Sequence, residues 1–401
     1  MTTIDYILSF LLYGRDDATQ LVGYTANQEE WHNYKVVILP QRESLADLYV
    51  PVLNKRLTTY RHEKTTVVEQ DLVYNTFFLV SMAEELLTKE RDCHGRFMAD
   101  LSVMAQQNML LIPVVDEYSR FLLKLLELPL PERGIKQINL THDIDILTRY
   151  RSIRSLLGAI KRGECNAAFR ACHNVLNDPA YTFPWISNIE QKFKATHPNT
   201  EILYFLKCGD STGNDYPQYH NSHTDLPRLT EFLFNQGAKF GLHASYASAD
   251  NPKLIKKEYM RLGNLLDKWH IPLQSANRTH FLRANSADYR RAIADAAIAD
   301  DYTAAFADKC GFRLGTTRPV RYIDPRTTEL TPLTLHPLTV MDCTLSDYMQ
   351  LDEDEAFYTC QQLIEKTATH NGTLTLLFHN QLLTPQSYHR RLYTEILKEL
   401  D

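Results

Sequence analysis

The stretch INLTHDID (residues 138–145) decides the fold of the larger part of this 401-residue chain. Its apolar residues Ile138 and Leu140 alternate with polar ones, which is the period of a strand with one apolar face. The same alternation places Asp143 and Asp145 on one face, so both carboxylates point the same way. The stretch therefore predicts a strand that ends in a paired acidic site.

Short apolar strands alternate with amphipathic helices after this stretch, in the order typical of βα units and a mainly parallel sheet. Further strands are predicted at residues 200–208, 239–243, 271–274, 311–316, 333–342 and 373–379. Because no glycine-rich turn follows the first strand, the pattern favours an incomplete or distorted (β/α)7 barrel over a doubly wound sheet. The predicted fold class is α/β, with a smaller mixed α/β domain before the barrel.

The chain before this barrel has a different pattern, with short apolar strands such as residues 36–40 among amphipathic segments. A helix there is stopped by Pro131 and Gly134, and this stop marks the expected domain boundary. We therefore predict an accessory domain over residues 1–133 and the barrel over residues 134–401. The first domain has no clustered histidines, phosphate loop or nucleophile elbow, so the sequence assigns it no chemistry.

Composition restricts the partners and the compartment. A net charge of −6 and dispersed Lys and Arg exclude the electrostatic signature of a nucleic-acid-binding protein. Seven cysteines without a C-x-x-C pair indicate reduced thiols. No stretch reaches the roughly 18 apolar residues of a membrane span, and Asp5 stands where a signal peptide needs positive charge. The expected location is cytoplasmic, and the sequence leaves the oligomeric state open.

Polar side chains follow the ends of several predicted strands, where parallel α/β folds place their active sites. Aspartate and histidine around an open position are typical of a catalytic metal site, in which the metal lowers the pKa of bound water. A second carboxylate can then take a proton, and an imidazole on the far side can donate one. The residues expected to converge are Asp143, Asp145, His243, Arg278, His280 and His379.

Six segments occur in an order and spacing that resembles the polysaccharide deacetylase (NodB homology) family, particularly its bacterial members with an extra amino-terminal domain. They are LTHDID, GLHASYAS, NRTHFLR, DYTAAFADKCGFRLGT, VMDCTLSDY and TLLFHN. The resemblance covers about residues 135–385. It implies a distorted (β/α)7 barrel that removes acetyl groups from N- or O-acetylated sugars with a divalent metal, commonly zinc.

The resemblance also implies roles for individual residues. Asp143 matches the general base and Arg278 the arginine that orients it. His379 matches the general acid, and Asp342 the carboxylate that supports this acid. We therefore expect these four residues to carry the proton transfers.

The metal ligands match less completely. Asp145 matches the metal-binding aspartate and His243 the first metal histidine, but the second histidine of the family, four residues later, is replaced by Ala247. His280 is the proposed substitute, and His142 is a poorer one because strand alternation turns it away. The predicted ligand set is therefore Asp145, His243 and His280, holding a divalent metal, with zinc preferred.

Two functions remain open. The first is a metal-dependent carbohydrate deacetylase acting on an acetylated saccharide or a glycan precursor. The second is a catalytically degenerate relative that kept the fold as a saccharide-binding or scaffolding module, which the alanine at position 247 favours. The presence of both a base and an acid favours the enzyme, because a binding module needs neither.

Overall fold

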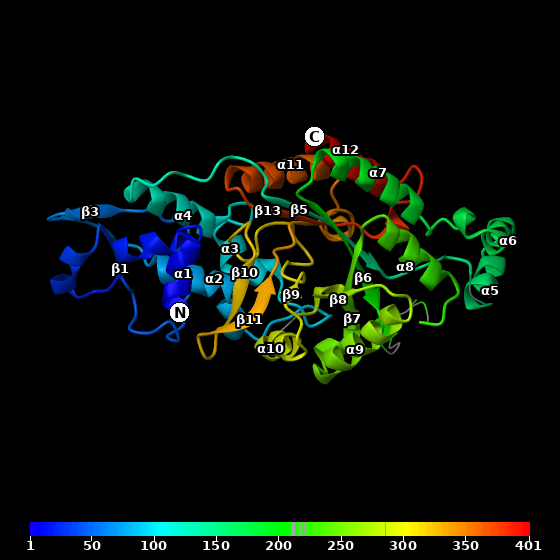
Figure 1. Cartoon of the computed structure of the whole chain (residues 1–401), viewed down its shortest axis with the longest axis horizontal. Helices are drawn as coiled ribbons and strands as arrows, with labels where there is room; N and C mark the ends of the chain where they lie inside the picture. Colours follow the sequence, from blue (N-terminus) through cyan, green and yellow to red (C-terminus); the bar gives the residue numbers. More distant parts are fainter. Residues whose placement is uncertain (152, 210–212, 216–218, 220, 285) are drawn as a thin grey trace.

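The computed structural model describes residues 1–151, 153–209, 213–215, 219, 221–284 and 286–401. Within these residues the chain forms a four-stranded sheet near the amino terminus and a nine-stranded sheet after it. Figure 1 shows the first sheet in blue at one end of the molecule and the second at its centre. The candidate site lies on the second sheet.

The small sheet has the order β1-β2-β4-β3, with β3 antiparallel to β4 and the other pairs parallel. Its strands and the neighbouring helices are β1 (Val22–Tyr24), β2 (Val36–Ile38), β3 (Thr59–His62), β4 (Thr65–Val68), α1 (Thr3–Leu11), α2 (Leu72–Val80), α3 (Val103–Gln106) and α4 (Val114–Leu125). Every residue of α2 is buried, because this helix packs on α1 and α4 and against β10 of the large sheet.

The large sheet has the order β10-β11-β9-β8-β7-β6-β5-β13-β12. Its strands are β5 (Gln137–Ile144), β6 (Thr200–Lys207), β7 (Lys239–Ala244), β8 (Leu273–Thr279), β9 (Asp300–Asp301), β10 (Val320–Asp324), β11 (Glu329–Leu335), β12 (Val340–Met341) and β13 (Thr373–Leu377). All its pairs are parallel except β10 with β11. The predicted parallel α/β class is therefore confirmed.

The predicted barrel is not confirmed, because the pairing among the described residues ends at β10 on one side and β12 on the other. The antiparallel pair of β10 and β11 extends the sheet beyond the short β9. This pair widens one edge of the sheet and leaves it open.

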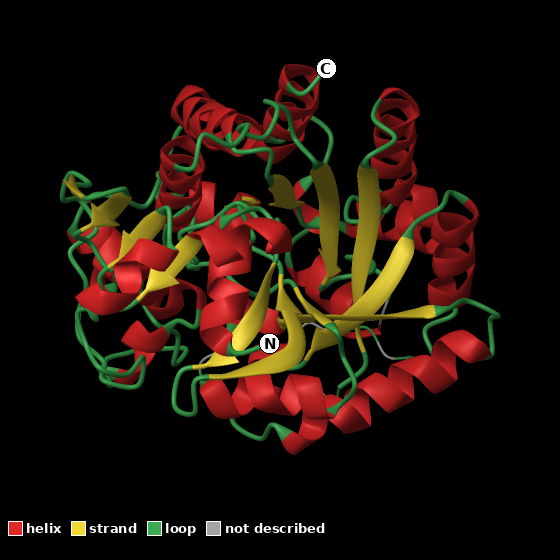
Figure 2. Cartoon of the chain, turned by 60° about the vertical axis from the view of Figure 1, so that its left-hand side comes forward, coloured by secondary structure: helices red, strands yellow, loops and turns green. Residues whose placement is uncertain are grey.

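Eight helices of the described chain accompany this sheet, and Figure 2 shows helices on the outer side of its strands. They are α5 (Ile153–Lys161), α6 (Cys165–His173), α7 (Phe183–Thr196), α8 (Asp225–Asn235), α9 (Lys253–Asp267), α10 (Ala287–Asp295), α11 (Glu353–Thr369) and α12 (Tyr388–Glu399). No helix within the described ranges is both long and apolar enough to cross a membrane.

The predicted strand at residues 311–316 is wrong. This segment is a loop in which Gly311 has φ +147° and Gly315 has φ +64°, values that favour glycine and break a strand. A Cβ on Gly311 would lie 2.6 Å from the carbonyl oxygen of Leu110. The glycines therefore serve a close approach to the amino-terminal part, where the Phe312 amide donates to that same carbonyl at 2.8 Å.

Buried ion pairs and a continuous apolar core join the two parts of the chain. Glu85 pairs with Arg290 at 2.9 Å and also with Arg313, and all three side chains are buried. Asp116 in α4 accepts from Arg318 at 2.8 Å. The division at residue 133 stays a prediction, and these contacts show that both parts share one interior.

Candidate functional site

The carboxyl ends of the large sheet bring the seven predicted site residues into one chain of contacts. Asp143 lies in β5, one residue before its end, His243 lies in β7 and Arg278 in β8, and the other side chains stand just beyond strand ends. Parallel strands present their carboxyl ends at one edge, which is why residues far apart in sequence meet here. The set is Asp143, Asp145, His243, Arg278, His280, Asp342 and His379.

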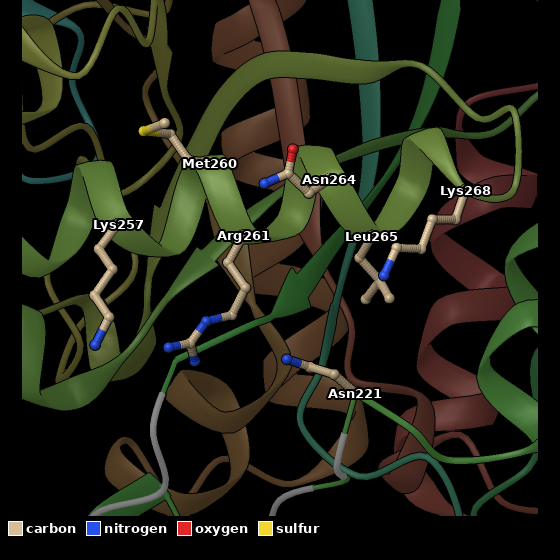
Figure 3. A pocket seen from close by; sticks show the side chains of 7 residues that line it. All are labelled: Asn221, Lys257, Met260, Arg261, Asn264, Leu265 and Lys268. Atoms are coloured by element: carbon tan, nitrogen blue, oxygen red, sulfur yellow. The ribbon is translucent and has the colours of Figure 1, made fainter.

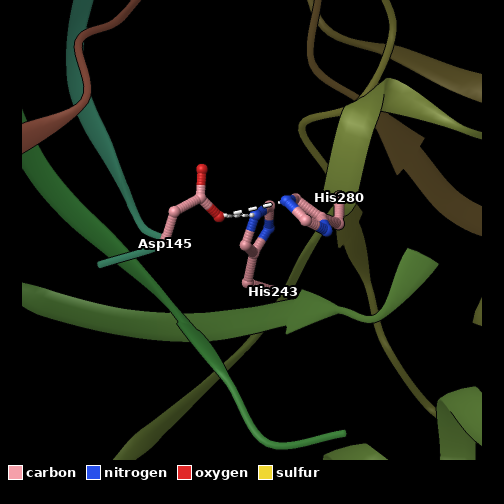
Figure 4. A group of neighbouring side chains, drawn as sticks. All are labelled: Asp145, His243 and His280. Atoms are coloured by element: carbon pink, nitrogen blue, oxygen red, sulfur yellow. Dashed lines mark ion pairs between the residues drawn. The ribbon is translucent and has the colours of Figure 1, made fainter. Parts of the chain in front are cut away.

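Asp145, His243 and His280 form a group with the geometry of a metal centre (Figure 4). Asp145 Oδ1 lies 3.3 Å from His243 Nε2 and 3.2 Å from His280 Nε2. Ligands bonded at about 2.0–2.1 Å to a tetrahedral ion are about 3.3 Å apart, so the two distances match edges of such a tetrahedron. The three potential ligand atoms all lie within 4.8 Å of one another.

Second partners fix the direction of both imidazoles. His243 Nδ1 lies 2.9 Å from the carbonyl oxygen of Arg278, and His280 Nδ1 lies 2.8 Å from Asp215 Oδ1. Since carbonyl and carboxylate oxygens accept hydrogen bonds, each Nδ1 is assigned as the donor, which leaves Nε2 as the basic atom. Both Nε2 atoms therefore face Asp145 with a lone pair available to a cation.

The polar atoms of this group fit a small divalent cation. His243 Nε2 is buried and has no hydrogen-bond partner within the described part of the chain, and the buried Asp145 Oδ1 is approached only through ion-pair contacts there. The ammonium of Lys207 already lies 2.9 Å from Asp145 Oδ1, as a cation would. Burial would raise the pKa of Asp145, but the Lys207 ammonium beside it holds this pKa well below its ordinary value. The carboxylate is thus charged and ready to bind.

Asp143 lies beside this group and is held by a buried arginine. Its Oδ1 accepts from Arg278 Nη1 at 3.1 Å, and its Oδ2 lies 3.7 Å from His243 Nε2. Arg278 is 0% exposed and also donates to Thr141 Oγ1 at 2.7 Å and to the carbonyl of Tyr302 at 3.1 Å. The guanidinium is therefore immobile, and it fixes one oxygen of Asp143 while the other faces the centre.

His379 lies on the opposite side of Asp145, with its Nε2 3.6 Å from Asp145 Oδ2. Asp342 holds it twice: one carboxylate oxygen lies 2.7 Å from His379 Nδ1, and the other accepts from the His379 amide at 2.6 Å. Burial would lower the pKa of His379, but Asp342 and Cys343 raise it well above its ordinary value. His379 is therefore protonated, with one nitrogen directed at the centre.

A cavity of about 220 Å³ opens beside these groups. Arg96 from the amino-terminal part forms part of its wall, donating to the carbonyl of Phe281 at 3.2 Å and to the Tyr348 hydroxyl at 3.0 Å. The sequence assigned this part no chemistry, yet it helps to build the cavity. The lining is Arg96, Asp143, Asp145, His280, Phe281, Leu282, Met341, Cys343, Asp347, Tyr348 and His379.

A second hollow, of about 480 Å³, lies along α9 and contains none of the predicted site residues (Figure 3). Basic, amide and apolar side chains surround it. They are Asn221, Lys257, Met260, Arg261, Asn264, Leu265 and Lys268.

The sequence reasoning missed Asp215 and Lys207. Asp215 is 1% exposed and stands in a short 3-10 turn (Gly213–Asp215), where no pattern distinguished it. Lys207 had a readable signal, because it ends an apolar strand just as His243 does, and the two residues are register partners. Ala247 lies in a 3-10 turn (Tyr246–Ala249) after β7, while His142 faces away, with Nε2 2.6 Å from Glu190.

Comparisons with known proteins give little beyond this geometry. A family model described as "Family of unknown function (DUF7033)" matches residues 16–131. No curated protein matches the chain. A crystal structure described as "putative polysaccharide deacetylase from Mycobacterium smegmatis" is similar with 13% sequence identity and a TM-score of 0.43, over 68% of this chain and 87% of that one.

Proposed function

We propose that the protein is a metal-dependent hydrolase that removes acetyl groups from an N- or O-acetylated saccharide or glycan precursor. One observation carries the proposal: the Asp145, His243 and His280 group stands between a fixed carboxylate and a fixed imidazolium. Acetyl hydrolysis needs a base on one side of the carbonyl and an acid on the other. The sequence resemblance to polysaccharide deacetylases supports the same reaction.

Asp145, His243 and His280 would hold the cation, and zinc suits a set of one carboxylate and two imidazoles. A bound divalent cation supplies Lewis acidity, which polarises the acetyl carbonyl and lowers the pKa of a water molecule.

The proton transfers belong to the chain's own side chains. Asp143 takes a proton from the attacking water as the water oxygen bonds to the acetyl carbon. His379 gives its proton to the sugar nitrogen or oxygen as the bond from that atom to the acetyl carbon breaks. The products are acetic acid, which loses its proton to solvent as acetate, and a free amino or hydroxyl group. Loss of the proton from Asp143 and uptake of one by His379 then restore both residues, so atoms and charge balance.

Fixed partners make these two roles possible. Arg278 engages one oxygen of Asp143 and fixes the carboxylate, because the guanidinium is itself buried and held by Thr141 Oγ1, the carbonyl of Tyr302 and the ring of Phe205. Asp342 stabilises the imidazolium of His379 and directs Nε2 toward the centre. Both proton carriers therefore need no rearrangement during the reaction.

A second candidate function is a saccharide-binding module without catalysis. The observation that favours it is the Lys207 ammonium, which lies 2.9 Å from Asp145 Oδ1 and could serve as a permanent substitute for a metal ion. In that case the buried charges would be structural.

Metal content and acetate release separate these functions. We would measure bound metal by elemental analysis in the wild type, His243→Ala and His280→Ala, and acetate release from a panel of acetylated sugars with Asp143→Asn as control. About one bound ion, lost in both histidine variants, together with acetate release that needs Asp143, supports the hydrolase. A protein that binds sugar, contains no metal and releases no acetate would be the binding module.

A further inference from the structure

Lys207 occupies an unusual place for a lysine. It ends β6, is 3% exposed, and extends its ammonium into the group of proposed metal ligands. Its Nζ lies 2.9 Å from Asp145 Oδ1 and 3.2 Å from His280 Nε2. Lysine is almost never fully buried without a partner, so these two atoms account for its position.

The same two atoms cannot serve the lysine and a metal ion together. An ion bonded at about 2.0–2.2 Å to Asp145 Oδ1 would stand within about 5 Å of the ammonium where it now lies. At such a separation in a buried site, two positive charges repel strongly. In addition, the single lone pair of His280 Nε2 can accept from the ammonium or bind the ion, but not both.

We propose that Lys207 is an internal competitor for the metal site: its ammonium holds Asp145 and His280 in the arrangement seen here and leaves that place when a divalent cation binds. The inference rests on the proposed function, because it takes the ligand set from it. The flexible four-carbon stem of lysine allows the displacement, and a cavity of about 220 Å³ borders Asp145 and His280, the two residues that the ammonium contacts.

The competition has a physical advantage and a cost. Asp143 Oδ2 and Asp145 Oδ1 lie 3.7 Å and 3.3 Å from the same atom, His243 Nε2, so the two carboxylates are neighbours. A nearby cation offsets the repulsion between their negative charges. Lys207 thus keeps the site assembled before a metal enters. The cost is metal affinity, because each binding event must first break the Lys207 contacts.

The test is the affinity of the full-length chain for Zn²⁺ alone, measured by competition with a chromogenic chelator. Lys207→Met keeps most of the stem and removes the charge, and we expect it to bind Zn²⁺ about tenfold or more tightly than the wild type, the scale typical of groups around metal ligands. Lys239→Met is the matched control, since this lysine also lies in the sheet but is half-exposed and pairs with Glu201. Its affinity should stay within about twofold of the wild type.

Thermal unfolding gives a second readout that does not depend on activity. Without metal, Lys207→Met removes the ammonium that pairs with the buried Asp145 carboxylate. The Tm of this variant should therefore fall below that of the wild type. Saturating Zn²⁺ should raise the Tm of the variant by more than that of the wild type, because tighter binding stabilises more. Lys207→Gln, which keeps a hydrogen-bond donor without the charge, serves if the methionine variant does not fold.

The outcomes separate this inference from the proposed function. Tighter Zn²⁺ binding by the Lys207 variants supports the inference, including the case in which only the variants bind. A wild type that binds Zn²⁺, with Lys207 variants of equal or lower affinity, overturns the inference and leaves the proposed function standing. Absence of binding by all the proteins overturns both.

Discussion

Replacement of Asp215 by asparagine should weaken metal binding although it changes none of the proposed metal ligands. Asp215 Oδ1 lies 2.8 Å from His280 Nδ1 and also accepts from the Tyr246 amide at 2.9 Å. Asparagine keeps an oxygen that can accept from both donors, so the geometry survives while the negative charge is lost. The perturbation therefore isolates the charge behind one imidazole.

The expected size of this effect follows from the contact itself. A hydrogen bond to a charged group contributes about 1.5–3 kcal/mol, roughly twice the value of a neutral one, so Asp215→Asn should remove about 1–1.5 kcal/mol. At about 1.4 kcal/mol for each factor of ten, the Kd for Zn²⁺ should rise about tenfold. This value lies at the lower end of the range of about 10–100-fold found for groups behind metal ligands.

The assay is chelator competition with Zn²⁺ on the full-length chain, and Asp250→Asn is the control. Asp250 lies on the same side of the fold and pairs with Arg283, but its side chain is 67% exposed and contacts none of the proposed ligands. An Asp215→Asn protein that folds normally and binds Zn²⁺ as tightly as the wild type would refute the assignment of His280 as a ligand oriented by Asp215.

Three further changes test other parts of the account. Glu85→Gln leaves two buried arginines without their carboxylate and should lower the free energy of unfolding in urea by about 3–5 kcal/mol. Glu365→Gln, in an exposed ion pair, should lower it by under about 1 kcal/mol. Equal losses for the two variants would contradict the buried network. Burial raises the pKa of Glu84 to about 7, so the folded state holds this proton more tightly and stability falls as pH rises from 4.5 to 7. The stability of Glu84→Gln minus that of the wild type should therefore be larger at pH 8 than at pH 5, by up to about 3 kcal/mol. A stability difference that does not change with pH would argue against the raised pKa of Glu84. Asp342→Asn removes the charge that holds His379, so kcat for acetate release should fall about 100-fold with metal content unchanged, and an unchanged kcat would remove His379 as the acid.

The sequence predicted the elements that follow a strict period. β6 and β7 lie where apolar runs predicted them. The sequence predicts such segments because each one buries a regular apolar face, and that periodicity does not depend on which elements pack against it. The segment at residues 311–316 misled this reading, since its apolar residues serve a glycine-dependent loop against the amino-terminal part.

The sequence also indicated the candidate site, because the carboxyl ends of parallel strands must meet at one edge. Alternation in the first strand correctly separated Asp143 from His142, which faces Glu190 instead. The face on which a side chain lies follows from its position along the strand, so the sequence predicts it before the fold is known.

Other features depend on contacts between distant segments. The open edges of the large sheet follow from which strands pair, and the sequence does not state pairing. Arg96 reaches the cavity only because the amino-terminal part packs against the large sheet. Asp215 lies behind His280, 65 positions away in the chain. No periodicity marks such residues.

The sequence by itself thus determined the α/β class, the succession of the main strands along the chain and the residue types at their ends. These features depend on local periodicity and on the direction of the chain. The tertiary structure decided that the sheet stays open, that the amino-terminal part supplies Arg96, and that Lys207 faces the same carboxylate as the two histidines. These features arise from side-chain contacts between segments far apart in sequence, and such contacts exist only once the chain has packed.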